Sequence, residues 1–295
     1  MAQDSGTRTL ISHAQISRGR GRVIYWTLLV VVVTAFTLIF LGPLYWMVTG
    51  ALKSGQEIAQ TPPTLFPKDP QPQNYIDAWN NLELAKLLFN TFYYAIGAVL
   101  FQLVFDAAAA YSLSKLRPIF GNVILGLMLG TLMIPAMVLI VPQYVTVIDL
   151  PILHINLLDS PFAIWLPLVA NAFNIFLLKR FFDSIPEELM AAALVDGATS
   201  LRTLWSIILP MSRPILGVVA ILAMTAVWKD FLWPKLVMPS PETRTVSVGI
   251  YSFAGGTPMN IVIAASVIAA IPTVIVFLIF QRNIMSGLTA GSIKG

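Results

Sequence analysis

Long runs of apolar residues recur along this chain. They cover about residues 23-48, 84-113, 120-148, 160-178, 214-238 and 260-281. Each run approaches or exceeds the roughly 20 residues that a helix needs to cross a bilayer. The pattern therefore predicts an all-α membrane protein with six transmembrane helices.

The polar segments between the runs indicate the orientation of the chain. Residues 1-22 form a polar N-terminal tail, residues 23-285 form the transmembrane domain, and residues 286-295 form a second tail. The first run is longer than the roughly 7–15 apolar residues of a signal peptide, so we expect it to be retained as a span. Most of the 18 Lys and Arg residues lie near the span ends on the side of the two tails. Both termini are therefore expected in the cytoplasm.

The composition supports this assignment and removes several classes of function. The chain is 57% hydrophobic and 11% charged, whereas about a quarter of the residues of a soluble domain are charged. The absence of cysteine excludes disulfides, thiolate metal sites and a cysteine nucleophile. We attribute the net charge of +4 to cytoplasmic loops, and we expect neither a nucleic-acid partner nor a metal site.

The segment between the fourth and fifth runs has the most specific pattern. Ser184 and Glu187 have the spacing of a capping box, which predicts a helix beginning there. Gly197 suits the left-handed residue that closes this helix, and Thr199 or Ser200 can cap a second one. Such a helix pair could dock into a groove of another protein or lie on the membrane surface. The second helix is expected to present one apolar stripe, formed by Leu201, Leu204, Trp205 and Ile208.

Two motifs in this segment resemble a known family. The run Ala-Ala-Ala-Leu-Val-Asp-Gly-Ala at 191-198, followed by Ile-Leu-Pro at 208-210, is similar to the cytoplasmic signature loop of ABC importer permeases, Glu-Ala-Ala-x-x-x-Gly with a downstream Ile-x-Leu-Pro. The segments 228-234 and 287-295 are similar to the six-span subunit of the maltose-type carbohydrate permeases. The resemblance extends over about residues 20-295 and implies the transmembrane domain of a type I ABC importer.

The resemblance also implies which residues meet an ATPase. In that family the signature loop docks into a cleft of the ATPase, and the C-terminal tail reaches the ATPases too. Ala191 stands where the family has a glutamate, so Glu187 or Glu188 substitutes for it, or the contact depends on shape and Asp196. The loop residues so implied are Glu187, Glu188, Ala191, Ala192, Asp196, Gly197, Ala198, Leu209 and Pro210, and the tail residues are Gly287, Thr289, Gly291 and Lys294.

The partners implied are a second homologous permease, two ATPase subunits, an extracytoplasmic solute-binding protein and a carbohydrate cargo. No G-x-x-x-x-G-K-[ST], H-E-x-x-H or G-x-S-x-G motif occurs, so no catalytic residues are predicted. ATP and Mg²⁺ would be bound by the separate ATPase, with no cofactor in this chain. Two alternatives remain: a permease for a sugar-phosphate ester, and an ion-coupled secondary transporter.

Several polar residues lie inside the apolar runs, where they are costly unless they face a cavity or a partner. Asp106 could serve the substrate path or could be a partnered residue at a helix interface. Asn171, Asn174 and Gln102 could line a path for sugar hydroxyls or join helices. Lys229 and Asp230 could form a pore-mouth site or a snorkelling pair. The candidate pathway residues are Asp106, Asn171, Asn174, Lys229 and Asp230.

Overall fold

The computed structural model describes residues 19–290, without the side chains of Arg20 and of residues 282–290, and contains only helices and connecting loops over that range. The principal helices are α2 (Gly19–Ala51), α4 (Gln73–Asn81), α5 (Leu84–Tyr111), α6 (Gly121–Thr131), α7 (Ala136–Ile148), α8 (Phe162–Leu168), α9 (Ala172–Asp183), α10 (Glu187–Val195), α13 (Arg213–Lys229), α14 (Leu232–Val237), α15 (Val246–Ala254) and α16 (Met259–Ala290). Shorter elements are α3 (Gly55–Ile58), α11 (Ser200–Thr203), α12 (Leu209–Met211) and the π-helical turns η1 (Ser112–Leu116) and η2 (Leu204–Ile208).

Three helices, α2, α5 and α16, are each long and apolar enough to cross a membrane. Three bent pairs pass the same test together: α6 with α7, at 103°; α8 with α9, at 51°; and the α11–α12 segment with α13, at 84°. The described residues thus provide up to six spans, as the sequence predicts. The helix of the fifth run is shorter than expected because α13 ends at Lys229 and Asp230 adopts an extended backbone before α14.

Proline contributes to one of these breaks. Pro135 precedes the first turn of α7, and a proline nitrogen cannot donate the hydrogen bond that would continue α6. Broken helices are tolerated in a bilayer where the freed backbone groups are buried in protein or line a wet cavity. The bends therefore indicate positions where the backbone is covered by protein or faces a water-filled space.

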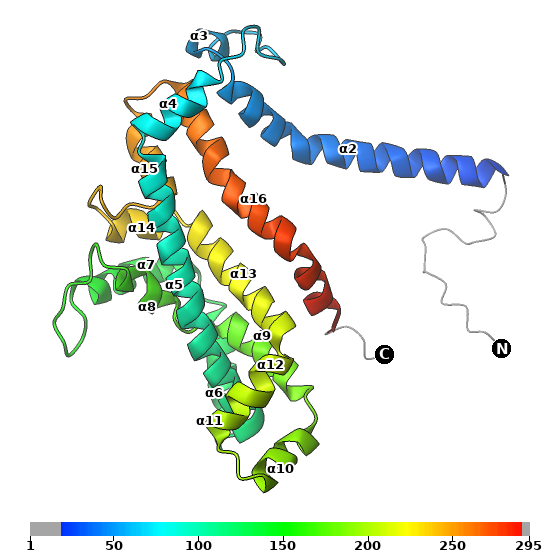
Figure 1. The fold of residues 1–295 in the computed structure, drawn as a ribbon, viewed down its shortest axis with the longest axis vertical. Helices are drawn as coiled ribbons and strands as arrows, with labels where there is room; N and C mark the ends of the chain where they lie inside the picture. The colour runs from blue at the N-terminus through cyan, green and yellow to red at the C-terminus, as the bar shows by residue number, and fades with distance from the viewer. Residues whose placement is uncertain (1–18, 291–295) are drawn as a thin grey trace.

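Helix α5 is the centre of the bundle. It packs against α13, α9 and α8, while α16 packs against α13 and α4 (Figure 1). One hydrophobic cluster joins α5, α9 and α13 in the lower half of the view, and a second joins α5, α8 and α14 above it. The elements α7, α8 and α14 gather on one side of α5 (Figure 1).

Helix α2 leaves the bundle and extends away from it as a long arm (Figure 1). Only Thr49, Gly50 and Ala51 at its end are buried, while the apolar side chains before them are largely exposed. An apolar groove of about 260 Å³ lies in the angle between α2 and α16, lined on α2 by Leu44, Met47 and Val48. This unpacked apolar surface is suited to lipid or to another membrane helix.

The loop before α15 is held by Asp159. Its carboxylate accepts hydrogen bonds from the Ser240 amide at 3.0 Å and the Ser240 hydroxyl at 2.7 Å, and from the Thr243 hydroxyl at 2.5 Å. Burial raises the pKa of Asp159, but the hydrogen bonds from Thr243 and Ser240 and the charge of Arg244 together lower it below the ordinary 3.8. The ionised carboxylate therefore fastens this loop to the end of the α7–α8 connection.

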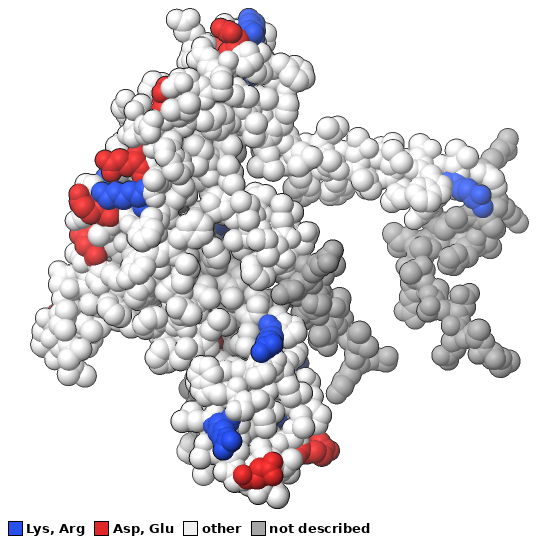
Figure 2. Space-filling view, in the orientation of Figure 1, with Lys and Arg blue, Asp and Glu red and all other residues white. Residues whose placement is uncertain are grey.

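Charged side chains are unevenly distributed. On the face shown in Figure 2 they lie in the upper part, at the lower end and towards the tip of α2, and the surface between them is almost without charge. On the helix bundle itself, an uncharged band between the upper and lower charged zones is the distribution expected for a protein embedded in a bilayer.

Candidate coupling segment and polar sites within the bundle

Residues 184–214 form the compact end of the molecule, at the bottom of Figure 1. The predicted capping box is wrong: Ser184 donates its hydroxyl to the carbonyl of Phe181, at the end of α9, with an O···O distance of 2.6 Å. Helix α10 begins at Glu187 after Pro186, without a side-chain cap. Proline fits this position because the first amides of a helix have no partner within it.

The glycine corner is confirmed. Gly197 has a φ of +71°, a conformation that costs little for glycine and is strained for other residues except asparagine or aspartate. Thr199 follows as the cap of α11, and its hydroxyl accepts a hydrogen bond from the Arg202 amide at 3.3 Å. The chain therefore reverses between two short helices as the sequence indicates.

The apolar stripe of the second helix is divided between two environments. Leu204 and Ile208 are buried, with exposed fractions of 6% and 0%, whereas Leu201 and Trp205 remain 70% and 62% exposed. The reason is the π-helical turn η2 at Leu204–Ile208. A π turn alters the angular spacing of side chains, so the i, i+3, i+4 rule assumed for an α-helix fails here.

The buried half of this stripe connects the segment to the bundle. Leu204 and Ile208 belong to the same hydrophobic cluster as Phe182 of α9, Tyr111 of α5 and Val219 of α13. Displacing α11–η2 would disturb the packing of all three helices. Because packed cores resist gradual deformation, force applied to the segment is transmitted to the bundle.

Polar contacts fix η1 and Arg117 to the end of α9 and to the start of the segment. Lys115 donates to the Ile185 carbonyl at 2.7 Å, Ser114 donates to Asp183 at 2.7 Å, and Arg117 forms an ion pair with Glu187. Glu187 therefore already has a partner within the chain. Glu188, in the same helical turn, is exposed and has no ion pair within the described part of the chain.

The residues assigned to ATPase contact lie mainly on the outside of the segment. Glu187, Glu188, Ala191, Ala192, Asp196, Gly197 and Pro210 are exposed, while Ala198 and Leu209 are half-buried. The tail residues Gly287 and Thr289 fall in the last turns of α16, for which only the backbone is described, and Gly291 and Lys294 lie outside the described residues.

Sequence reasoning missed two residues at the corner. Leu194 and Val195 are 76% and 87% exposed and precede the Gly197 corner, as the exposed Leu201 and Trp205 follow it. The signal was an apolar pair directly before the helix-ending Asp196. We call Leu194, Val195, Leu201 and Trp205 the apolar tip.

The polar residues predicted inside the membrane form one network between α5 and α9. Oδ1 of Asp106 accepts a hydrogen bond from the Asn171 amide at 2.9 Å, and the Asn174 side chain donates to Gln102 at 2.8 Å. The Asn171 side chain caps α9 by accepting from the Asn174 amide. Asp106, Gln102 and Asn174 are buried, at 0%, 2% and 3% exposed. This arrangement favours a role in joining the helices over direct contact with cargo.

Lys229 and Asp230 lie apart from that network, at the break between α13 and α14. Lys229 is exposed, whereas half-buried Asp230 accepts a hydrogen bond from the Trp233 amide at 3.3 Å. Asp230 also lines a hollow of about 310 Å³ between α7, α8 and α14. The two residues form no ion pair with each other, which argues against the snorkelling pair.

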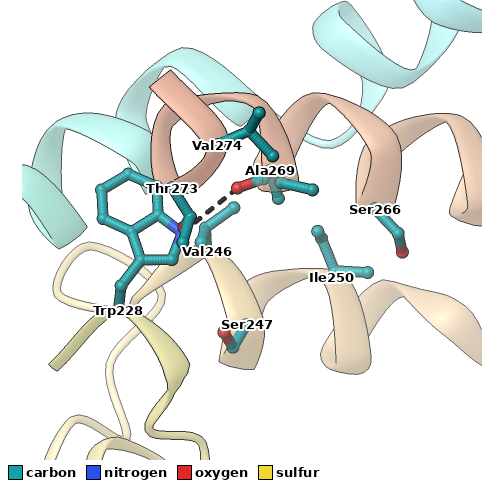
Figure 3. A pocket seen from close by; sticks show the side chains of 9 residues that line it. Trp228, Val246, Ser247, Ile250, Ser266, Ala269, Thr273 and Val274 are labelled. Atoms are coloured by element: carbon teal, nitrogen blue, oxygen red, sulfur yellow. Dashed lines mark hydrogen bonds between the residues drawn. The ribbon is translucent and has the colours of Figure 1, made fainter. Parts of the chain in front are cut away.

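A larger hollow, of about 430 Å³, lies between α13, α15 and α16 (Figure 3). Trp228 forms one edge, and its indole nitrogen donates to the Ala269 carbonyl of α16 at 3.1 Å. Figure 3 shows the indole directed at α16, with Ser247 and Ile250 on α15 and Ser266 on α16 around the space. Trp228 thus joins α13 to α16.

The bundle has broken spans with polar groups at the breaks, and the segment 184–214 packs at one end of it. This is the architecture of a membrane transport protein. The family described as "Binding-protein-dependent transport system inner membrane component" matches residues 102–289, and the chain belongs to this family. It is a multi-pass inner-membrane protein of a transport system, and its family consists of permeases rather than enzymes.

Relatives and a solved structure agree with this assignment. The chain is 33% identical over 259 residues to the sulfoquinovosyl glycerol transport system permease protein SmoH of Agrobacterium fabrum, covering 86% of this chain and 89% of that protein. It is 33% identical to the sn-glycerol-3-phosphate transport system permease protein UgpE of Yersinia enterocolitica, covering 85% and 91%. A bacterial ABC transporter involved in the import of the acidic polysaccharide alginate contains a chain that is 26% identical, with a TM-score of 0.79, covering 90% and 98%.

Proposed function

We propose that this chain is the membrane-spanning subunit of an ATP-driven importer that carries a carbohydrate across the cytoplasmic membrane. The observation that carries the proposal is the segment 184–214, which has an exposed apolar tip on one side and buried Leu204 and Ile208 on the other. Such a segment can both bind a partner and move the helices behind it. The names of SmoH and of the alginate transporter support a carbohydrate cargo.

The motor in this proposal is a pair of separate ATPase subunits, which bind the ATP and Mg²⁺. The apolar tip and Glu188 would meet the ATPase, because Glu187 is already paired with Arg117. Closure of the ATPases would shift residues 184–214, and the shared hydrophobic cluster would carry that shift into α5, α9 and α13. The result is an exchange between two packed states of the bundle.

Two further partners complete the proposal. A second, homologous permease would cover the exposed arm of α2 and the groove between α2 and α16. An extracytoplasmic solute-binding protein would deliver the cargo, in keeping with the family description. The segment 184–214 and both termini would then face the cytoplasm, since basic residues concentrate at these ends.

A second candidate cargo is a sugar-phosphate ester. It is favoured by the 33% identity to the glycerol-3-phosphate permease UgpE. An ion-coupled secondary transporter is the alternative mechanism, and it would need no ATPase.

The test of the proposed function is to purify the tagged chain from its native membranes in mild detergent and to identify the proteins that come with it by mass spectrometry. We expect an ATPase with a phosphate-binding loop and a second, non-identical permease. Recovery of the chain alone or as a homo-oligomer, under conditions that preserve other such complexes, would support the secondary transporter instead.

A further inference from the structure

Three interruptions of the helices meet around the hollow that contains Asp230. Its wall includes the first half of α7, which follows the 103° bend. It also includes the end of α8, just before its break with α9, and the start of α14, where α13 has ended. Figure 1 shows α7, α8 and α14 together on one side of the bundle. Interrupted helices at membrane depth must be covered by protein or face water. Because these three interruptions surround a hollow, we infer that the hollow is filled with water.

The size and lining of the hollow suit a small hydroxylated molecule. Its volume of about 310 Å³ is at the lower end of the roughly 300–1,000 Å³ of small-molecule sites. The polar groups of its wall include the carboxylate of Asp230 and the side-chain amide of Gln143, both half-buried. Trp233 adds an aromatic surface, and Met137, Ile140 and Leu168 add aliphatic ones. Apolar walls with a few polar groups are the usual composition of such sites.

The charge of the lining distinguishes between kinds of cargo. Asp230 is the ionisable residue of the wall, and neither lysine nor arginine lines this hollow; neighbouring Lys229 is exposed and outside it. The Trp233 amide occupies part of the acceptor capacity of Asp230, but a carboxylate has about four lone-pair sites. It can therefore accept hydrogen bonds from sugar hydroxyls, while it repels phosphate, sulfonate or carboxylate groups.

We propose that the hollow between α7, α8 and α14 is a cargo site for a neutral, hydroxyl-rich sugar or polyol unit, with Asp230 and Gln143 as its hydrogen-bonding groups and Trp233 as its stacking surface. The site selects against anionic units. This inference rests on the proposed import function and decides between its two cargo classes, since a phosphate ester would meet an unfavourable charge here.

The absence of native cysteine allows a direct test in the full chain, in membranes that contain its natural partners. The Gln143→Cys variant introduces a single thiol into the wall of the hollow. It is treated with three methanethiosulfonates that carry a glucose unit, a cationic ammonium group or an anionic sulfonate group. Each labelling rate is divided by the rate of the same reagent with a free thiol in solution. Val141→Cys, on the same helix but 70% exposed and outside the hollow, is the matched control.

We expect the glucose-bearing and cationic reagents to label Gln143→Cys several-fold faster than the anionic one. Adding Asp230→Asn should raise the relative rate of the anionic reagent, and Asp230→Lys should raise it further. Val141→Cys should show neither effect, because its side chain faces away from the hollow.

Equal rates for the three reagents, or no labelling of Gln143→Cys by any of them, would overturn the cargo site. The proteins that copurify with the labelled chain distinguish a failure of the cargo site from a failure of the proposed import function. If an ATPase and a second permease are recovered but the charge preference is absent, only the cargo site is wrong. If these partners are missing, the import function is wrong whatever the labelling pattern.

Discussion

The amide of Asn171 donates to Oδ1 of Asp106 at 2.9 Å, and this bond fixes the break between α8 and α9 against the C-terminal part of α5. Asp106 has no exposed surface, and its Oδ2 has no hydrogen-bond partner among the described residues. A buried polar group held by one defined contact is costly to bury but specifies one arrangement of its neighbours. Asp106 therefore sets the position of the α8–α9 break.

Substitution at Asp106 tests this role. Asp106→Ala should destabilise the protein by about 1–3 kcal/mol, because the Asn171 amide loses its acceptor. Asp106→Asn keeps an oxygen in place and should cost less. The measurement is the thermal unfolding of each purified variant in the same detergent. Equal stability of the alanine variant and the unchanged protein would show that the break is fixed by other contacts.

The corner at Gly197 predicts a difference between two substitutions. An added Cβ would meet no heavy atom within 4 Å, so the penalty comes from the backbone conformation at φ +71° alone. Gly197→Val should cost about 1–3 kcal/mol locally and should abolish uptake and recovery of the ATPase. Gly197→Asn should be tolerated, because asparagine adopts this conformation more readily. Uptake by the valine variant at the unchanged rate would contradict a rigid corner.

The apolar tip predicts a localised loss of binding. Trp205→Ala should weaken binding of the ATPase by about 2 kcal/mol or more, since exposed tryptophans often dominate interfaces. Neighbouring Ser206 is also exposed, and Ser206→Ala is the control that should bind normally. The amount of ATPase recovered at increasing salt and detergent concentrations gives the comparison. An equal loss in both variants would indicate disruption of the segment rather than loss of a contact.

The anchor at Asp159 predicts a defined pH dependence. The pKa of Asp159 is lower in the folded protein than the ordinary 3.8. The stabilisation by Asp159 is therefore complete above pH 3.8 and is lost as the pH falls through the folded-state pKa. Exchange of the amide hydrogens at residues 238–245, corrected for intrinsic rates, should therefore stay constant from neutral pH to about 5 and increase only below the ordinary carboxyl range. Asp159→Ala should give fast exchange at every pH. An increase already near pH 6 would point to another group.

The class of fold could be predicted from the sequence because the main signal is the length of the apolar runs. That length is set by the thickness of the bilayer rather than by detailed packing. The sequence also predicted the corner at Gly197, since a single residue type suits that backbone. It could not predict the π turn at Leu204–Ile208, because the apolar residues of this segment have the spacing of an ordinary α-helix.

The pathway residues show the same limit. Asp106, Asn171 and Asn174 are recognisable as unusual in sequence, and the structure brings them together. Their burial between α5 and α9 depends on the tertiary structure. The same holds for Gln143, Trp233 and Asp230, which line one hollow. Residues far apart in the chain and without a common motif give no signal of such proximity.

The π turn has a consequence for how such proteins diversify. Leu201 and Trp205 are exposed, whereas Leu204 and Ile208 are buried in the bundle. The residues that can contact a partner therefore differ from those that anchor the segment. In the proposed importer, mutations at the outward positions would change which ATPase is bound without repacking the membrane helices. A chimera that exchanges only Leu194, Val195, Leu201 and Trp205 should therefore keep its fold, whereas exchange of the whole segment would place foreign side chains inside the bundle.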